Sequence, residues 1–234
     1  MALFSLLDPQ TILGIMIIAI DGPSGTGKST VAKGVAKALG FAFFDTGAMY
    51  RSMAWWLNKM GVDLSDEKAV ALKLPDFKYE IKGLGEHRKY FVDQIDVTDR
   101  IRSHEISGFA SKIAIYKEVR TALVKIQREF GSKVDAVFEG RDMGTVVFPQ
   151  AKVKIFLTAD PEIRASRRYL ELMAKEPTGH YSKEQILADI QDRDFKDTTR
   201  QISPLKKADD AVLLDTSHLT AEQVIQKVIE ITKQ

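Results

Sequence analysis

Short apolar runs alternate along the chain with segments whose apolar residues recur every three or four positions. The runs lie at residues 15–20, 41–44, 134–138, 151–160 and 210–217. Between the first two, the segment 28–39 has helical spacing and is followed by Gly40, a residue typical of helix C-caps. Apolar strands that alternate with helices are typical of a parallel sheet covered on both faces. The pattern therefore predicts an α/β fold with a five-stranded parallel core sheet.

In residues 74–98 the apolar residues recur at every second position. Within this segment "FKYEIK" and "KYFVDQIDVT" alternate apolar and polar positions, and "GLGEHR" between them supplies a turn. Such alternation is typical of half-buried antiparallel strands. We therefore expect a small antiparallel β insertion here. Helices resume over 103–131, and a last helix at 220–233 opens with Thr220 and Gln223 at the spacing of a capping box.

The composition limits the classes of partner. The 234 residues carry a net charge of only +2, which gives no electrostatic case for binding nucleic acid or a membrane surface. The absence of cysteine excludes disulfides and thiolate metal sites and fits a reducing compartment, so we expect a cytoplasmic protein. Residues 1–14 are expected to form an N-terminal extension. Asp8-Pro9-Gln10 interrupts its apolar residues, and we expect neither a signal peptide nor a membrane helix there.

The strongest motif follows the first apolar run. Gly22, four residues, Gly27-Lys28 and Ser29 have the spacing of the phosphate-binding Walker A loop, with a predicted strand before it and a helix after it. Lys28 is expected to reach the β- and γ-phosphates of ATP, and Ser29 to ligate Mg²⁺. The residues predicted to bind the nucleotide in this loop are Gly22, Pro23, Ser24, Gly25, Thr26, Gly27, Lys28, Ser29 and Thr30.

Three further segments place arginines near the expected ligand edge of the sheet. "DTGAMYR" (45–51) follows the second strand, and "EGRDMGT" (139–145) places Arg141 and Asp142 at the end of another. In "DRDFKDTTR", Arg193, Asp197 and Arg200 share one helical face. Three separate arginine sites near one phosphate loop favour an anionic substrate. The four histidines are scattered and show no metal-binding or catalytic spacing.

The residues alone leave three functions open: a kinase with a phosphate acceptor, a kinase with a hydroxyl acceptor, and a non-catalytic nucleotide switch. A GTPase is disfavoured, because the chain's Asn-Lys pair, Asn58-Lys59, lies in a predicted helix and lacks the Asn-Lys-x-Asp pattern. A kinase with a phosphate acceptor needs no general base, because a phosphate monoester is already mostly dianionic at neutral pH. A kinase with a sugar- or shikimate-like hydroxyl acceptor would need one, and Asp45 or Asp142 is available. A non-catalytic nucleotide switch is the third possibility.

Four segments together carry a resemblance to a known family. "IAIDGPSGTGKST", "DTGAMYR", "EGRDMGTVVFP" and "KIFLTAD", in this order, resemble bacterial cytidylate kinases, members of the nucleoside monophosphate kinase family. The resemblance covers nearly the whole chain from Ile17 and includes the β insertion. It implies ATP-dependent phosphorylation of CMP and dCMP with Mg²⁺, by a monomer that binds neither nucleic acid nor membrane. The N-terminal extension and Thr198-Thr199, where relatives often carry more arginines, depart from the family pattern.

The resemblance also implies domains and residue roles. A P-loop three-layer fold would comprise a core (15–45, 134–162 and 205–234), an NMP-binding region (46–133) and a short helical lid (163–200). The expected residues that surround the acceptor phosphate and sugar are Thr46, Tyr50, Arg51, Arg141, Arg193 and Asp197. Ser111, Arg120 and Asp142 would read cytosine, and Arg164 and Arg168 would lie in the lid over ATP. Lys28, Arg141, Arg193 and Arg200 would carry the catalytic positive charge.

Overall fold

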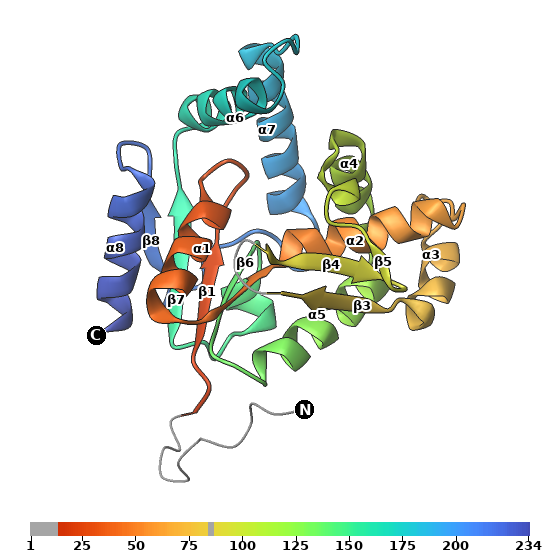
Figure 1. The fold of residues 1–234 in the computed structure, drawn as a ribbon, viewed down its shortest axis with the longest axis horizontal. Coiled ribbons are helices and arrows are strands. Elements are labelled where there is room, and N and C mark those ends of the chain that lie inside the picture. Colours follow the sequence, from red (N-terminus) through yellow and green to blue (C-terminus); the bar gives the residue numbers. More distant parts are fainter. Residues whose placement is uncertain (1–13, 84–86) are drawn as a thin grey trace.

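The computed structural model describes residues 14–83 and 87–234. Most of the predicted extension and three residues of the predicted 83–88 turn lie outside these ranges. The main sheet has the strand order β2-β6-β1-β7-β8, and all its neighbours pair in parallel. The predicted five-stranded parallel sheet is confirmed (Figure 1). Its strands are β1 (Ile17–Asp21), β2 (Ala42–Asp45), β6 (Ala136–Gly140), β7 (Val153–Thr158) and β8 (Val212–Asp215).

Helices cover both faces of this sheet, as the continuous apolar strands require. On one face, α1 (Lys28–Leu39) and α8 (Ala221–Thr232) enclose a core that includes Ile18, Ile20 and Val137. On the other face, α5 (Lys117–Gly131) packs beside a cluster that contains stacked phenylalanine rings. The predicted C-cap Gly40 and the capping box of α8 are both present. The fold is a three-layer P-loop α/β fold.

A second core forms beyond the β2 edge. The helices α2 (Thr46–Lys59), α3 (Glu67–Lys73) and α4 (His104–Ile113) pack there against a separate antiparallel sheet with the order β3-β4-β5. The buried Trp56 indole donates to Asp93, 2.8 Å away in the turn after β4, and so ties α2 to this sheet. The predicted antiparallel insertion is confirmed. Its strands are β3 (Tyr79–Lys82), β4 (Lys89–Val92) and β5 (Ile95–Asp96), and single 3₁₀ turns flank them at Leu74–Asp76 and Arg100–Arg102.

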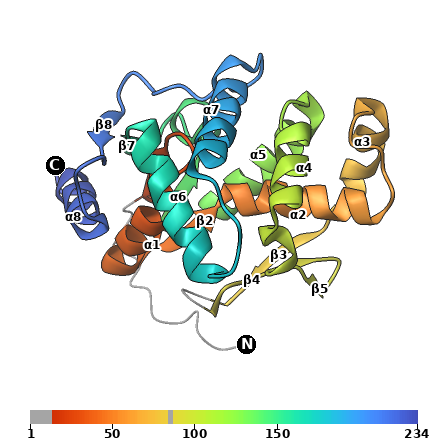
Figure 2. The same ribbon diagram turned by 90° about the horizontal axis from the view of Figure 1, so that it is seen from above.

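Two helices that pack against each other follow β7 in the chain. α6 (Pro161–Lys175) and α7 (Lys183–Thr199) pack through Ala165, Ile186 and Ile190. They lie beyond the end of the sheet where the Walker loop sits, and α7 runs back toward α2 (Figures 1 and 2). The segment predicted as a lid, residues 163–200, comprises most of these two helices. Among the described residues, no helix combines the length and apolar character needed to cross a membrane.

Candidate active site

The Walker loop connects the end of β1 to the first residue of α1. Gly22, Gly25 and Gly27 all have positive φ angles, 148°, 78° and 85°. At Gly22 a Cβ atom would lie 2.2 Å from the carbonyl oxygen of Leu157, so only glycine fits. Gly27 is the N-cap of α1 and offers no side-chain acceptor to the first-turn amides. These amides and the helix dipole form a ready phosphate cradle.

Lys28 lies buried at the base of this loop. Its ammonium group donates to the carbonyl oxygen of Pro23 at 2.6 Å. Burial lowers the pKa of Lys28 well below its ordinary value, and the nearby positive charges of Arg141 and Arg193 lower it further. A cation so placed is short of negative charge, and a bound phosphate would supply it.

Glu139 is a buried carboxylate beside Ser29. Burial is the main cause that raises its pKa, to about 7, and a hydrogen bond from the Ser29 hydroxyl opposes the rise. Within the described chain, its Oε1 atom is buried and has no hydrogen-bond partner. Carboxylate and hydroxyl oxygens are the donors that Mg²⁺ prefers. The two side chains therefore fit a Mg²⁺ ion, although the described residues contain no cluster of three or more acidic or histidine side chains.

Two of the arginines predicted to be catalytic, Arg141 and Arg200, bond to Asp197 of α7. Arg141 Nε donates to Asp197 Oδ2 at 2.8 Å, and Arg200 Nη1 approaches Oδ1 at 3.4 Å. Arg193 is different. Burial and the neighbouring Arg141 lower the pKa of Arg193 to about 10, and in the described residues its buried Nε has no partner. The predicted face of Arg193, Asp197 and Arg200 thus turns toward the site rather than toward solvent.

Asp45 and Arg51 form a second pair, at the start of α2. Asp45 accepts from the Ala48 amide (2.8 Å) and so caps the helix, and its other oxygen accepts from Arg51 (3.0 Å). Burial alone would raise the pKa of Asp45, but Arg51 and the Ala48 amide hold it below its ordinary value. Thr46, next in the chain, donates to the backbone carbonyl of Glu139 at 2.7 Å. Asp45 is therefore an ionised structural anion.

A third pair joins Arg120 of α5 to Asp142. Both side chains are about 4% exposed, and Arg120 Nη2 donates to Asp142 Oδ2. The Arg120 guanidinium also lies 5.5 Å from the Tyr50 ring centre, and burial raises the pKa of Tyr50 to about 12. Ser111 is half-buried on α4. The structure thus joins Tyr50, Arg120 and Asp142 in one cluster.

Asp21, the last residue of β1, holds the chain that follows Asp142. Its two carboxylate oxygens accept from the amides of Met143 (2.9 Å) and Gly144 (2.8 Å). These amides belong to a π-helical turn, Met143–Val147. Burial raises the pKa of Asp21 to about 6. One carboxylate therefore links the strand that leads into the Walker loop to the turn that directly follows Arg141 and Asp142.

Comparison with known proteins identifies the family. Residues 18–234 match the family model for cytidylate kinase. The chain belongs to the cytidylate kinase family. The cytidylate kinase of Protochlamydia amoebophila is 49% identical over 92% of this chain and 95% of its own length. Those of Solibacter usitatus (45%) and Fusobacterium nucleatum (44%) match 93% and 90% of this chain and 92% and 94% of their own lengths. The predicted resemblance is confirmed.

The two arginines predicted to lie in the lid, Arg164 and Arg168, have different surroundings in this cytidylate kinase family member. Arg164 is buried, and it donates to the carbonyl oxygens of Ala159 (3.0 Å) and Ser24 (2.9 Å). It is therefore in direct contact with the Walker loop. Arg168 is partly exposed on α6 and pairs with Glu171 at 2.8 Å.

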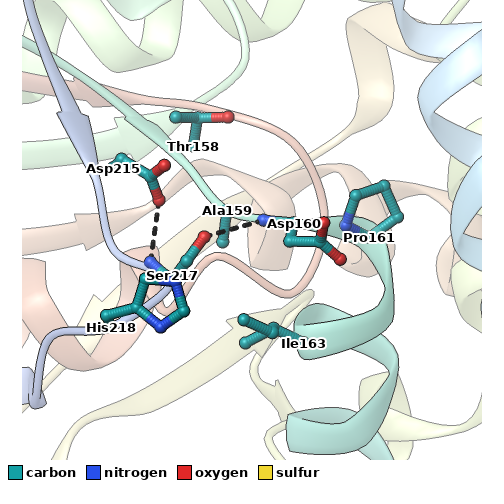
Figure 3. A pocket seen from close by; sticks show the side chains of 8 residues that line it. All are labelled: Thr158, Ala159, Asp160, Pro161, Ile163, Asp215, Ser217 and His218. Atoms are coloured by element: carbon teal, nitrogen blue, oxygen red, sulfur yellow. Dashed lines mark hydrogen bonds between the residues drawn. The ribbon is translucent and has the colours of Figure 1, made fainter.

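A separate pocket lies at the carboxyl ends of β7 and β8 (Figure 3). Ser217 donates its amide to Asp215 (2.8 Å), and its hydroxyl accepts from the amide of Asp160 (2.9 Å). Two carboxylates line this pocket and no lysine or arginine does, so it is unsuited to phosphate. Its lining residues are Thr158, Ala159, Asp160, Pro161, Ile163, Asp215, Ser217 and His218.

The sequence prediction assigned no role to Glu139 or Asp21. The predicted strand ended at Phe138, whereas β6 runs from Ala136 to Gly140 and includes Glu139. The available signal was a carboxylate near the end of a buried strand, a position typical of the acidic residue that binds Mg²⁺ together with the loop Ser or Thr in P-loop enzymes.

Proposed function

We propose that this protein transfers the γ-phosphoryl group of ATP to CMP and dCMP, giving ADP with CDP or dCDP. One observation carries the proposal most directly. The buried Lys28 of the Walker loop has Arg141 and Arg193 near enough that their positive charges lower its pKa. A single cluster of positive charge suits two phosphate groups that must approach each other. The sequence relatives are named cytidylate kinases.

On the donor side, Lys28 and the loop amides would hold the β- and γ-phosphates. Arg164 and Arg168 remain proposed ATP contacts. Ser29 and Glu139 would hold Mg²⁺, which neutralises charge on the phosphate oxygens when it is bound. Because phosphoryl transfer passes through a state with charge spread over the phosphate oxygens, positioned cations are the main catalytic requirement.

On the acceptor side, Arg51, Arg141 and Arg193 would grip the monophosphate, with Thr46, Tyr50 and Arg200 nearby. A phosphate monoester has a second pKa of about 6 and therefore needs no general base. A hydroxyl acceptor would need one. Both aspartates available for that role already carry an arginine, Asp45 with Arg51 and Asp142 with Arg120. Their ion pairs favour the phosphate acceptor over the hydroxyl acceptor.

Base selection would rest on Asp142, Arg120 and Ser111. Cytosine offers an N4 amino donor and ring acceptors, which a carboxylate and a guanidinium can match. Uracil presents an acceptor where cytosine presents the amino group. Asp197 would meet the sugar hydroxyls while it holds Arg141 in place. We further propose a cytoplasmic monomer that binds neither nucleic acid nor membrane.

ADP release in a coupled assay tests the proposal. CMP, dCMP, UMP, AMP and shikimate serve as acceptors, and Lys37→Ala, an exposed lysine on α1, is the control for Lys28→Ala. We expect rapid turnover with CMP and dCMP, slower turnover with UMP, and loss of turnover in Lys28→Ala only. Turnover with shikimate alone would favour a hydroxyl acceptor. ATP binding without turnover on any acceptor would favour the nucleotide switch.

A further inference from the structure

Asp194 of α7 contacts the Walker loop directly. Its Oδ1 accepts from the backbone amide of Ser24 at 3.1 Å, and its Oδ2 pairs with Arg164 of α6. The Asp194 side chain is only 18% exposed. This carboxylate stands outside the set of residues proposed to touch either nucleotide.

Arg164 completes the contact from the other helix. The Nη1 atom that pairs with Asp194 also donates to the carbonyl oxygen of Ser24 at 2.9 Å. The amide of Ser24 is therefore bound by α7 and its carbonyl by α6. Both helices of the lid segment meet at a single residue of the donor loop.

The same part of α7 faces the acceptor site. Arg193 directly precedes Asp194, and Asp197 follows three residues later and pairs with Arg141 at 2.8 Å. One helical turn thus bonds to the donor loop through Asp194 and to an acceptor arginine through Asp197. A displacement of α7 relative to the loop would move Arg193 and Asp197 together.

We propose that Asp194 is a positioning residue that fixes α7 on the Walker loop, so that the acceptor arginines stand in register with the γ-phosphate. The proposal rests on the proposed kinase function. In-line transfer is sensitive to small displacements, and an error of about 1 Å can cost roughly a hundredfold in rate. Binding of ATP would also fix the loop to which α7 is bonded, and so would favour binding of CMP.

A purely structural role makes a different prediction. If Asp194 only stabilises the fold, its loss lowers the melting temperature but leaves kcat and the two affinities of the folded molecules unchanged. A positioning role lowers kcat in fully folded protein. It also weakens the effect of one nucleotide on the affinity for the other.

The experiment compares Asp194→Ala and Asp194→Asn with Asp192→Asn. Asp192 lies on the same helix and makes an exposed pair with Lys196, so it is a matched control. Asparagine at 194 keeps an acceptor for the Ser24 amide but loses the ion pair with Arg164. Steady-state kinetics give kcat and KM for ATP and CMP well below each melting temperature. Calorimetric titration gives the affinity for CMP with and without a non-hydrolysable ATP analogue.

We expect Asp194→Ala to lower kcat about tenfold to a hundredfold and to remove most of the increase in CMP affinity caused by the ATP analogue. Asp194→Asn should lie between Asp194→Ala and the wild type, and Asp192→Asn should match the wild type. Wild-type kcat and undiminished cooperativity in a folded Asp194 variant would overturn the positioning role alone. A wild-type protein without kinase activity would overturn the proposed function and this inference together. If Asp194→Ala does not fold, Asp194→Asn decides by the same criteria.

Discussion

Most of the proposed donor end is one continuous stretch, residues 22–30, to which β6 and α6 add individual side chains. The proposed acceptor end draws its residues from α2, α4, α5, the turn after β6 and α7. The partners of the positively charged side chains also differ between the two ends. Lys28 bonds to a backbone carbonyl of its own loop, but Arg51, Arg120 and Arg141 each bond to a carboxylate. Two of these carboxylates come from distant parts of the chain.

This difference has an energetic consequence. Loss of an acceptor arginine leaves a partly or fully buried carboxylate without its partner, which destabilises a protein. Loss of Lys28 removes a buried cation whose charge the folded state already disfavours, as its lowered pKa indicates. Substitution of Lys28 should therefore lower activity without lowering the melting temperature. Substitution of an arginine that is paired with a carboxylate should lower both.

The largest effect is expected at Lys28. Lys28→Ala should lower kcat about a hundredfold to a thousandfold, because it removes positive charge from the developing phosphoryl transition state. The melting temperature without ligand should not fall. Kinetics and thermal unfolding measured beside Lys37→Ala check both statements. Near-normal turnover in a folded Lys28→Ala protein would refute the assignment of the loop.

Arg193 is proposed to lie on the acceptor side, yet like Lys28 it has a lowered pKa and no carboxylate partner among the described residues. Its pKa is lowered, to about 10, by burial and by Arg141. Arg193→Met should reduce kcat/KM for CMP about tenfold to a hundredfold but raise the melting temperature by roughly 2–4 °C. Arg51→Met, which leaves Asp45 unpaired, should reduce activity and lower the melting temperature. If both variants shift the melting temperature in the same direction, the comparison of paired and unpaired cations fails.

Asp142→Ala tests selection of the base. An unmatched buried polar contact costs about 1–3 kcal/mol, so the preference for CMP over UMP should fall about tenfold or more. Total activity also falls if Asp142 merely shapes the loop by pairing with Arg120, and so total activity does not decide. The ratio of kcat/KM for CMP to that for UMP decides. Equal losses with both nucleotides would leave Asp142 with the loop-shaping role only.

The smallest effect concerns the pH dependence of stability at Asp21. Its pKa is about 6 in the folded state against an ordinary 3.8, so the folded protein holds the proton more tightly than the unfolded chain does. Asp21 therefore contributes less to stability as the pH rises from about 4 to 6. The asparagine in Asp21→Asn cannot titrate. Its side-chain NH2 group would also face a backbone N–H, so two donors would meet.

Melting temperatures measured from pH 4 to 7 check this. We expect the wild type to be the more stable of the two at pH 4 and its advantage over Asp21→Asn to narrow toward pH 6. Asp135→Asn, which alters a carboxylate that binds the Met16 amide at the opposite end of β1, is the control. An advantage that is constant or widens with pH would contradict the raised pKa of Asp21.

The sequence was sufficient to predict features set by neighbouring residues. The strands and their periods, the Walker loop and the capping box at Thr220 and Gln223 are all local patterns. Three segments that carry proposed acceptor residues were also found, because two follow strand ends and the third has its charged residues on one helical face. Ser111 and Arg120 came only from the family resemblance.

The partners of those residues could not be predicted. The pairing of Arg141 with Asp197 and of Arg120 with Asp142 joins elements 56 and 22 residues apart. Periodicity carries no information about such contacts, which depend on how the helices pack. Glu139 was missed for a related reason. A charged residue at a strand end resembles the start of a loop, but here β6 continues in register with β1 and β2 as far as Glu139.

In the proposed function, the donor and acceptor nucleotides occupy one continuous site. A dinucleotide in which five phosphates join adenosine to cytidine tests it in a single molecule. We expect this compound to compete with both ATP and CMP and to bind about a hundredfold or more tightly than either nucleotide, because the second contact becomes intramolecular. Competition with ATP alone, at an affinity no better than that of ATP, would contradict the claim.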